Sequence, residues 1–283
     1  MNRLFNFLQN LKRLPGRAAV IESMYTESKL SRVAAYQSSV MLRYLLADNI
    51  AKLSLEEKNY RVVTDHKVAL QSNDHLYPLG ALTDVTHSPQ LVNWANSYFG
   101  RKIQFMDLGC AGGGVVCDFL LHGHEAIGIE GSSVPEMSGT GFWPFLVNTL
   151  FTADITKPFQ VIEQEKNVRF DLITAWEVLE HIPEKDVYGL LSNIKSHLKP
   201  EGLFIGSIAQ FESIDPASGV DLHINVNSQK WWKDQFLGAG FEILENPPIW
   251  SMSRGSGNRT ATDWDASLEP YLGFHIAVKI LNH

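Results

Sequence analysis

A glycine-rich turn beside an acidic residue is the first feature of this sequence that could do chemistry. The segment IQFMDLGCAGGGVVCDFLL places Asp107 and Gly109 where a buried strand would meet a helix. In a doubly wound sheet, small ligands bind at this junction, the carboxyl end of a strand. Gly109 frees the backbone to turn tightly, and Gly112 and Gly113 would let a ligand lie against bare main chain. The turn therefore predicts a small-molecule pocket.

The glycines do not fit the common phosphate-binding patterns. The dinucleotide pattern G-x-G-x-x-G fails in both registers, because Ala111 is at the third position from Gly109 and Cys117 is at the sixth from Gly112. The P-loop pattern requires a lysine after its glycines, and none follows here. Phosphate binding at this turn is therefore disfavoured.

Two further carboxylates end later apolar runs. Glu130 closes EAIGIE, 21 residues after Gly109, where an acidic side chain can accept hydrogen bonds from both ribose hydroxyls of a nucleoside. Asp154 follows LFTA and can face an adenine amino group, with Ile155 beside the ring. These positions predict a nucleoside ligand without a pyrophosphate.

Alternating strands and helices must position these residues. From Lys102 onward, short apolar runs alternate with helical stretches, which is the βαβ rhythm of an α/β fold with a doubly wound parallel sheet. We expect strands over 103–109, 125–130, 147–155, 169–177, 202–209, 241–245 and 272–281, and helices over 113–122, 184–198 and 228–239. The polar segment 251–265 is expected to be a loop.

The first 100 residues are expected to form a helical cap over this domain. Leucines at helical spacing over 4–14, with basic neighbours, predict an amphipathic helix that docks on its own protein, a partner or a membrane surface. A second helical pattern runs from Ser31 to about Tyr60, and 64–89 is expected to be an irregular connector that acts as a substrate lid. A helix after Pro89 should end at Gly100, which divides 1–100 from 101–283.

Composition narrows the partners and the compartment. The 283 residues are 45% apolar and carry a net charge of -7, so a large core is expected and binding to nucleic acid is disfavoured. Two cysteines, Cys110 and Cys117, are too few for a zinc site and too closely spaced for a structural disulfide, which favours a cytoplasmic location. The sequence has no run of 18 apolar residues, so stable membrane insertion is not expected. Whether the chain forms homo-oligomers stays open.

Five ordered motifs resemble the class I S-adenosylmethionine (SAM)-dependent methyltransferases. They are MDLGCAGGG (106–114), the strand-end Glu130, LFTADI (150–155), FDLITAWEVLEHIP (170–183) and LKPEGLFIGSI (198–208). Ala111 departs from the family pattern, which usually has a glycine there. The resemblance implies a Rossmann-like seven-stranded sheet whose last strand is antiparallel, with SAM as cofactor. It implies cofactor-binding roles for Asp107, Gly109, Cys110, Ala111, Gly112, Gly113, Glu130, Asp154, Ile155, Trp176 and Glu177.

Methyl transfer to a hydroxyl often uses a base, and two histidines are candidates for this catalytic role. His181 lies in WEVLEHIP, where a structural role is an equal alternative, and His223 lies in DLHINVNS, where Asp221 would orient its imidazole. Trp176 is either a pocket residue or part of the core. No metal is expected. An oxygen-rich site built from Asp215, Asp221, Asp263 and Asp265 with His223 is the weaker alternative.

A looser resemblance points to a subgroup of small-molecule and sugar O-methyltransferases. It covers Phe151 to His181, the segment 221–244 and part of the connector. It implies that Asp74, His75, Asp84 and His87 bind the acceptor, a hydroxyl of a sugar or another small polar metabolite in glycan or natural-product biosynthesis. The alternatives are N-methylation of a small amine and a non-catalytic SAM-binding partner protein.

Overall fold

A computed structural model describes residues 59–215, 218–245 and 269–281 of the chain. The chain divides into two compact units, residues 1–52 and 53–283, and every described residue belongs to the second. The predicted boundary at Gly100 falls inside this second unit. The helices predicted over 4–14 and from Ser31, and the loop 251–265, lie outside the described residues.

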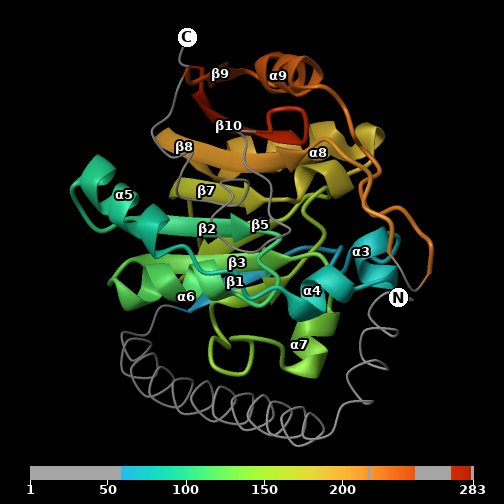
Figure 1. Cartoon of the computed structure of the whole chain (residues 1–283). Coiled ribbons are helices and arrows are strands. Elements are labelled where there is room, and N and C mark those ends of the chain that lie inside the picture. Colours follow the sequence, from blue (N-terminus) through green and yellow to red (C-terminus); the bar gives the residue numbers. More distant parts are fainter. Residues whose placement is uncertain (1–58, 216–217, 246–268, 282–283) are drawn as a thin grey trace, which may run out of the picture. The chain divides into compact units, whose positions relative to one another are not determined.

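A seven-stranded sheet forms the centre of the second unit (Figure 1). Strands β2, β3, β4, β7 and β8 are parallel, and β10 lies antiparallel between β8 and β9. Across the sheet, the order is β4 (Leu150–Thr152), β3 (Glu125–Glu130), β2 (Gln104–Leu108), β7 (Phe170–Trp176), β8 (Leu198–Ala209), β10 (Gly273–Ile280) and β9 (Phe241–Ile243). The predicted α/β fold and its antiparallel last strand are confirmed.

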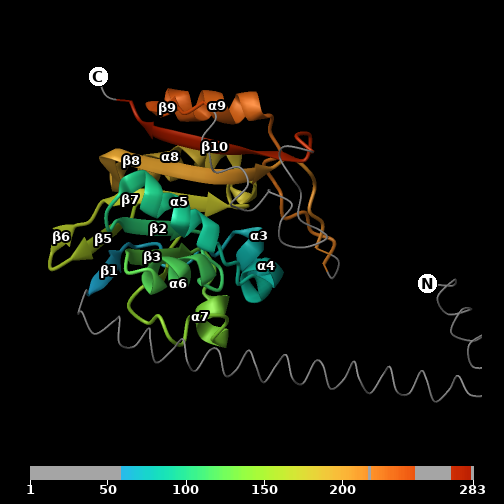
Figure 2. The same cartoon turned by 60° about the vertical axis from the view of Figure 1, so that its left-hand side comes forward.

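Helices cover both faces of this sheet, which explains why its parallel strands are continuous apolar runs. On one face lie α5 (Pro89–Phe99) and α6 (Gly114–Leu121), where the rings of Phe105 in β2 and Phe119 in α6 stack with centroids 3.7 Å apart. On the other face, α8 (Glu184–His197) and α9 (Gln229–Gly238) contribute Leu190 and Trp232 to the core that contains Met106 (Figure 2).

The ends of these helices follow from local sequence. Helix α5 has Pro89 in its first turn, where the missing N–H is no loss, and ends at Gly100 with a φ of 62°, as predicted. Helix α8 has acidic residues in its first turn and Lys195 and His197 in its last, which suits the helix dipole. Among the described residues, no helix combines the length and hydrophobicity needed to cross a membrane.

Several elements were not predicted. A small antiparallel sheet pairs β1 (Tyr60–Val63) with β5 (Gln160–Glu163), and β5 with β6 (Lys166–Asn167). The segment between β5 and β6, Gln164 and Glu165, has φ angles of 47° and 62° without a glycine, so the usual sequence sign of such a hairpin is missing. Short helices also occur at α7 (Val134–Ser138) and at the 3-10 helix η1 (Leu179–His181).

The connector 64–89 is not wholly irregular, contrary to the sequence prediction. It contains α3 (Asn73–Leu76) and α4 (Leu79–Thr83). The Ser72 hydroxyl accepts a hydrogen bond from the Asp74 backbone N–H and thereby caps α3, which a polar, turn-rich composition does not reveal. Backbone bonds tie the connector to the sheet domain, from Ala69 N–H to the Gly131 carbonyl and from Gly112 N–H to the Asp84 carbonyl.

Candidate active site

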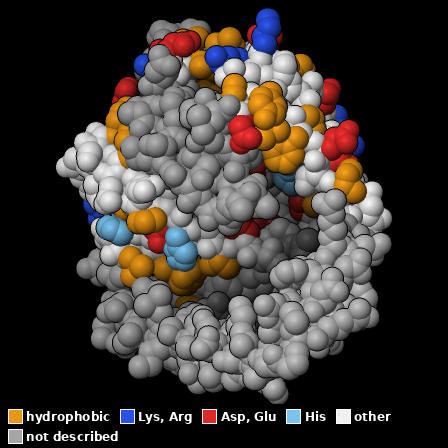
Figure 3. Space-filling view, viewed as in Figure 1, with side chains coloured by type: hydrophobic (Ala, Val, Ile, Leu, Met, Phe, Trp, Pro, Cys, Tyr) orange, Lys and Arg blue, Asp and Glu red, His pale blue; other side chains and the backbone are white. Residues whose placement is uncertain are grey.

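A cavity of about 940 Å³ lies at the carboxyl ends of β2, β3 and β7, and the connector helices line it too. Its volume is within the range of small-molecule sites. Its walls include residues that the sequence analysis assigned to different roles: Gly109, Ala111, Glu130, Asp154, Asp74, His181 and His223. On the face seen in Figure 1, histidine and acidic side chains reach the surface beside hydrophobic ones (Figure 3).

The turn after β2 presents only part of its glycine-rich segment to the cavity. Gly109 and Ala111 line it, with φ angles of 70° and 42°. A Cβ on Gly109 would overlap the Val178 side chain, and Ala111 adopts the left-handed conformation that usually favours glycine. A tight turn therefore brings the main chain up to the cavity at these two positions.

Gly112 and Gly113 meet protein rather than open space. A Cβ on Gly112 would lie 2.7 Å from the Asp84 carbonyl oxygen, which also accepts the Gly112 N–H at 2.9 Å. Gly113 is the N-cap of α6, with a φ of 77°, and a Cβ there would lie 2.6 Å from the Leu150 side chain. The structure thus gives a packing reason for these glycines, and neither residue lines the cavity.

Asp107 and Cys110 lie behind the turn. Asp107 is buried, and its Oδ1 accepts the Thr174 hydroxyl at 2.6 Å. Cys110 is buried with a free thiol, whose pKa burial raises well above its usual value, and Cys117 is also free. Asp107 and Cys110 are absent from the cavity wall. They support the turn from the sheet side.

Glu130 lies in the cavity wall at the end of β3. Its Oε2 accepts the Ala111 N–H and its Oε1 accepts the Ser132 N–H, each at 2.9 Å. Burial raises the pKa of this carboxyl, and the N–H donors of Ser132 and Ala111 act in the opposite direction. A carboxylate oxygen has two acceptor positions, so both oxygens can still accept a hydroxyl. The residue therefore links two loops and can bind a diol.

The residues after β4 and β7 complete the predicted cofactor side. Asp154 and Ile155 line the cavity, and Asp154 Oδ1 accepts the Thr156 hydroxyl at 2.6 Å. Trp176 is both buried and part of the cavity wall, and its indole N–H has no hydrogen-bond partner among the described residues. Glu177 also lines the cavity, in a left-handed conformation with a φ of 54°.

In the cavity wall, His181 forms an ion pair with Asp74 of the connector. Its Nδ1 lies 2.9 Å from Oδ1 of Asp74 in α3. Burial alone would lower the pKa of His181, but Asp74, with Glu180 and Glu177, outweighs burial and raises it to about 9. The imidazole is therefore cationic near neutral pH, which makes it a poor proton acceptor in this state.

His223 is the neutral histidine of the site. Its Nδ1 lies 2.6 Å from the Phe211 carbonyl, to which it donates, so Nε2 keeps its lone pair. Burial, followed by the charge of His181, lowers the pKa of His223 to about 4. Asp221 does not orient the imidazole, contrary to the prediction. Its Oδ1 accepts the backbone N–H groups of Ser213 and His223 and so shapes the loop.

Glu180 was not singled out from the sequence. Its side chain is 0% exposed, and Oε1 accepts the Ala209 N–H at 3.1 Å. Oε2 is buried and has no hydrogen-bond partner among the described residues. Burial, then the charge of Glu177, raises the pKa of Glu180 to about 8. The available signal was its place before His181 in WEVLEHIP, but spacing alone could not show that it points inward.

The four predicted acceptor residues separate into two pairs. Asp74 and Asp84 line the cavity. His75 and His87 do not: Nδ1 of His75 lies 3.2 Å from the Ser132 hydroxyl, and Nδ1 of His87 lies 2.8 Å from Oδ1 of Asp118. The connector therefore offers Asp74 and Asp84 to the cavity, whereas His75 and His87 attach it to the loop after β3 and to α6.

The oxygen-rich metal site considered from the sequence does not assemble among the described residues. Asp215 Oδ2 accepts the Ser218 hydroxyl and N–H, and Asp221 caps its own loop. Asp263 and Asp265 lie outside the described residues.

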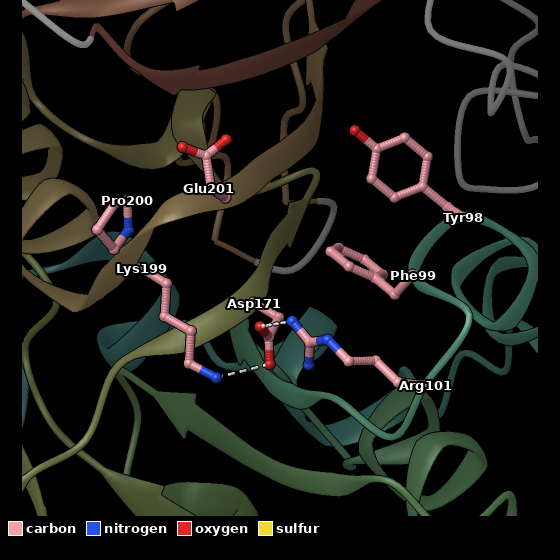
Figure 4. A pocket seen from close by; sticks show the side chains of 7 residues that line it. All are labelled: Tyr98, Phe99, Arg101, Asp171, Lys199, Pro200 and Glu201. Atoms are coloured by element: carbon pink, nitrogen blue, oxygen red, sulfur yellow. Dashed lines mark hydrogen bonds and ion pairs between the residues drawn. The ribbon is translucent and has the colours of Figure 1, made fainter.

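A second hollow, of about 580 Å³, lies at the opposite end of the sheet, where β7 begins (Figure 4). Arg101 and Lys199 both point to the buried Asp171, with N–O distances of 2.7 and 2.8 Å. Burial alone would raise the pKa of Asp171, but these cations and the Gln104 N–H outweigh burial and lower it. The carboxylate is satisfied by protein groups, so this hollow is a structural junction.

Comparison with known proteins gives matches to methyltransferases. Residues 42–246 match a family model described as a methyltransferase domain, a span that includes β1 through β9 and every residue of the cavity wall. A curated relative, the ubiquinone biosynthesis O-methyltransferase of Actinobacillus pleuropneumoniae serotype 7 (strain AP76), is 32% identical over 124 residues. That match covers 40% of this chain and 48% of the relative, so the chain spans about half of the relative's length.

The solved structures that match this chain are more distant in sequence. A TehB-like SAM-dependent methyltransferase from Corynebacterium glutamicum is 15% identical, with a TM-score of 0.47, over 73% of this chain and 94% of that chain. The glycopeptide N-methyltransferase MtfA complexed with sinefungin is 14% identical, with a TM-score of 0.44, over 70% of this chain and 88% of that chain.

Proposed function

We propose that this chain, which belongs to the methyltransferase domain family and is the class I SAM-dependent methyltransferase that its motifs predicted, methylates a hydroxyl of a sugar or another small polar metabolite. The observation that carries the hydroxyl assignment is the neutral imidazole of His223 in the cavity wall. Its Nδ1 is engaged with the Phe211 carbonyl, which leaves Nε2 as a proton acceptor beside the cofactor residues.

The residues of the cavity fit SAM. Glu130 would hold the ribose hydroxyls, Asp154 the adenine amino group, and the main chain at Gly109 and Ala111 the methionine end. The unpartnered indole N–H of Trp176 is a further donor in the same wall. SAM, when bound, supplies an activated methyl group on a sulfonium.

Proton removal distinguishes a hydroxyl acceptor from an amine in this proposal. A hydroxyl becomes a good nucleophile as it loses its proton, and Nε2 of His223 accepts that proton. His181 cannot do so in its cationic form. It stays paired with Asp74 and keeps a positive charge near His223. The acidic side chains Asp74 and Asp84 would accept hydrogen bonds from the other hydroxyls of a polar acceptor.

The test is a binding and turnover experiment on the full chain. S-adenosylhomocysteine (SAH) binding is measured by calorimetry, and radiolabelled methyl transfer is screened against nucleotide sugars, glycans, phenols and amines. We expect SAH to bind and hydroxyl acceptors to be methylated. His223→Gln should reduce kcat about 100-fold, near the lower end for general-base catalysis, because a pKa of about 4 makes a weak base.

His122→Gln is the matched control, since His122 is exposed at the C-terminal end of α6 and does not line the cavity. It should leave kcat unchanged. Turnover of amines alone would replace the hydroxyl assignment with N-methylation. SAH binding without turnover of any acceptor class would favour the non-catalytic alternative, and absence of SAH binding would refute the proposal.

A further inference from the structure

Three potential metal ligands meet in the acceptor part of the cavity. Glu180, His181 and His223 each bring one candidate ligand atom within 4.8 Å of the others. The first two residues lie on η1 and the third on the loop after β8, and the two imidazole rings are nearly perpendicular, with centroids 4.8 Å apart. Because His181 and His223 line the SAM-type cavity, the cluster faces the space for the acceptor.

The buried carboxyl group of Glu180 has one oxygen, Oε2, for which the described residues supply no partner. Its side chain is 0% exposed, and only Oε1 is hydrogen-bonded, to the Ala209 N–H. Leaving the buried Oε2 without a partner costs free energy, and a carboxylate in that position loses more. A cation at the cluster would satisfy this oxygen and balance the acidic groups around it.

Both histidines are held in the way that metal-bound histidines are held. A ligating imidazole typically has its second ring nitrogen fixed by a carboxylate or a backbone carbonyl. Asp74 Oδ1 lies 2.9 Å from Nδ1 of His181, and the Phe211 carbonyl lies 2.6 Å from Nδ1 of His223. In each ring, the other nitrogen is left for a ligand.

We propose that Glu180, His181 and His223 form a binding site for a divalent first-row transition-metal ion. Two imidazoles and one carboxylate favour Mn²⁺, Fe²⁺, Co²⁺ or Zn²⁺ over Ca²⁺ and Mg²⁺, which prefer oxygen ligands alone. Ligand atoms about 2.1 Å from an ion lie at most about 4.2 Å apart. The ligand atoms here are within 4.8 Å of one another, so the side chains must move slightly closer together when the ion binds. Three protein ligands leave positions open, as in catalytic rather than structural metal sites.

The site deepens the proposed function and, for its catalytic role, rests on it. A divalent ion lowers the pKa of an oxygen that it binds. An acceptor hydroxyl on the open positions would lose its proton to solvent water, with His223 acting as a ligand and no longer as the direct base. Asp74 would be a positioning residue, because it reaches the ion only through His181.

Metal binding is tested on the full chain after removal of metals with EDTA. Mn²⁺ is titrated with and without SAH, and free Mn²⁺ is followed by electron paramagnetic resonance. We expect a single site, and Glu180→Gln and His223→Gln should each weaken it at least 10-fold. Asp74→Asn should weaken it about 10- to 100-fold, as outer-shell changes do elsewhere. Glu184→Gln and His122→Gln, both exposed and outside the cluster, should leave it unchanged.

The same titrations separate this inference from the proposed function. Glu180→Gln preserves the acceptor for the Ala209 N–H, and circular dichroism with SAH calorimetry checks that each variant is folded. SAH binding without Mn²⁺ binding would overturn the metal site and leave methyl transfer intact. Metal binding that Glu180→Gln and His223→Gln do not weaken would also overturn it. Metal binding without SAH binding would count against the proposed function alone.

Discussion

Replacing Glu130 by glutamine removes one acceptor from the cavity wall, at the position proposed to bind the ribose of the cofactor. In the wild type, two carboxylate oxygens accept two backbone N–H groups, from Ala111 and Ser132. Glutamine keeps one oxygen and turns an amide donor toward the second N–H. One buried N–H then lacks an acceptor, which costs about 1–3 kcal/mol of folding free energy.

The effect on the cofactor is a second, separable loss. A hydrogen bond from a ribose hydroxyl to a charged carboxylate is about 1–2 kcal/mol stronger than one to a neutral amide. At 1.4 kcal/mol per factor of ten, Glu130→Gln should therefore weaken SAH binding roughly 5- to 30-fold. Isothermal calorimetry measures the affinity, and urea denaturation measures the folding term.

Glu125→Gln is the matched control, because it makes the same chemical change at the amino end of the same strand. Its carboxylate accepts the Tyr60 hydroxyl at 3.0 Å and does not line the cavity. SAH affinity should stay within about twofold of wild type. If Glu130→Gln binds SAH as tightly as wild type, or if both variants lose affinity equally, the ribose role assigned to Glu130 is refuted.

Three further predictions concern the stability of the sheet domain. Asp171→Asn should lower the unfolding free energy at pH 7 by about 1–3 kcal/mol, because a neutral amide loses the charge-assisted hydrogen bonds that the buried carboxylate accepts from Arg101 and Lys199. The pKa of Asp171 is lowered in the folded state, so this stabilisation is present above the unfolded pKa of about 3.9 and is lost as pH falls below it. Urea titrations should find the wild-type advantage shrinking as pH falls below about 4, and a constant difference would contradict the assignment. Ala111→Gly should raise the unfolding free energy by up to about 1 kcal/mol, because glycine adopts the φ of 42° without strain. The greater conformational freedom of glycine in the unfolded chain offsets part of this gain. A lower unfolding free energy in the variant would show that the backbone at Ala111 is not strained. Gly109→Ala should destabilise the fold by about 2–5 kcal/mol, from its φ of 70° and its overlap with Val178. Combined with Val178→Ala, it should show a favourable coupling of about 1–3 kcal/mol in a double-mutant cycle, whereas strict additivity would exclude the overlap.

The regular elements of the sheet domain were predictable because their signals are local. Each strand of the central sheet is a short apolar run, and each flanking helix has helical spacing and a recognisable end, such as Gly100 after α5. The β5–β6 hairpin was not predictable, since Gln164 and Glu165 adopt positive φ without the usual glycine. Its partner β1 is distant in sequence, and no local pattern reports a pairing that depends on the assembled chain.

The meeting of the strand-end carboxylates in one cavity was predictable for a related reason. In a parallel sheet, residues that end neighbouring strands meet at one edge, so Glu130 and Asp154 could be placed together from their positions after apolar runs. Sequence could not tell which residues of the turn face the cavity. Gly112 looked like a ligand-contacting glycine, but its missing Cβ makes room for the carbonyl of Asp84.

The sequence by itself determined the βαβ order, the acidic strand ends and a nucleoside-sized pocket, because these follow from periodicity and from residues close together in the chain. Only the tertiary structure decided the charges within that pocket. Asp74 makes His181 a cation, while burial beside it keeps His223 neutral and leaves Glu180 with an unpartnered oxygen. These states depend on desolvation and on contacts among three distant segments, which exist only after the chain has folded.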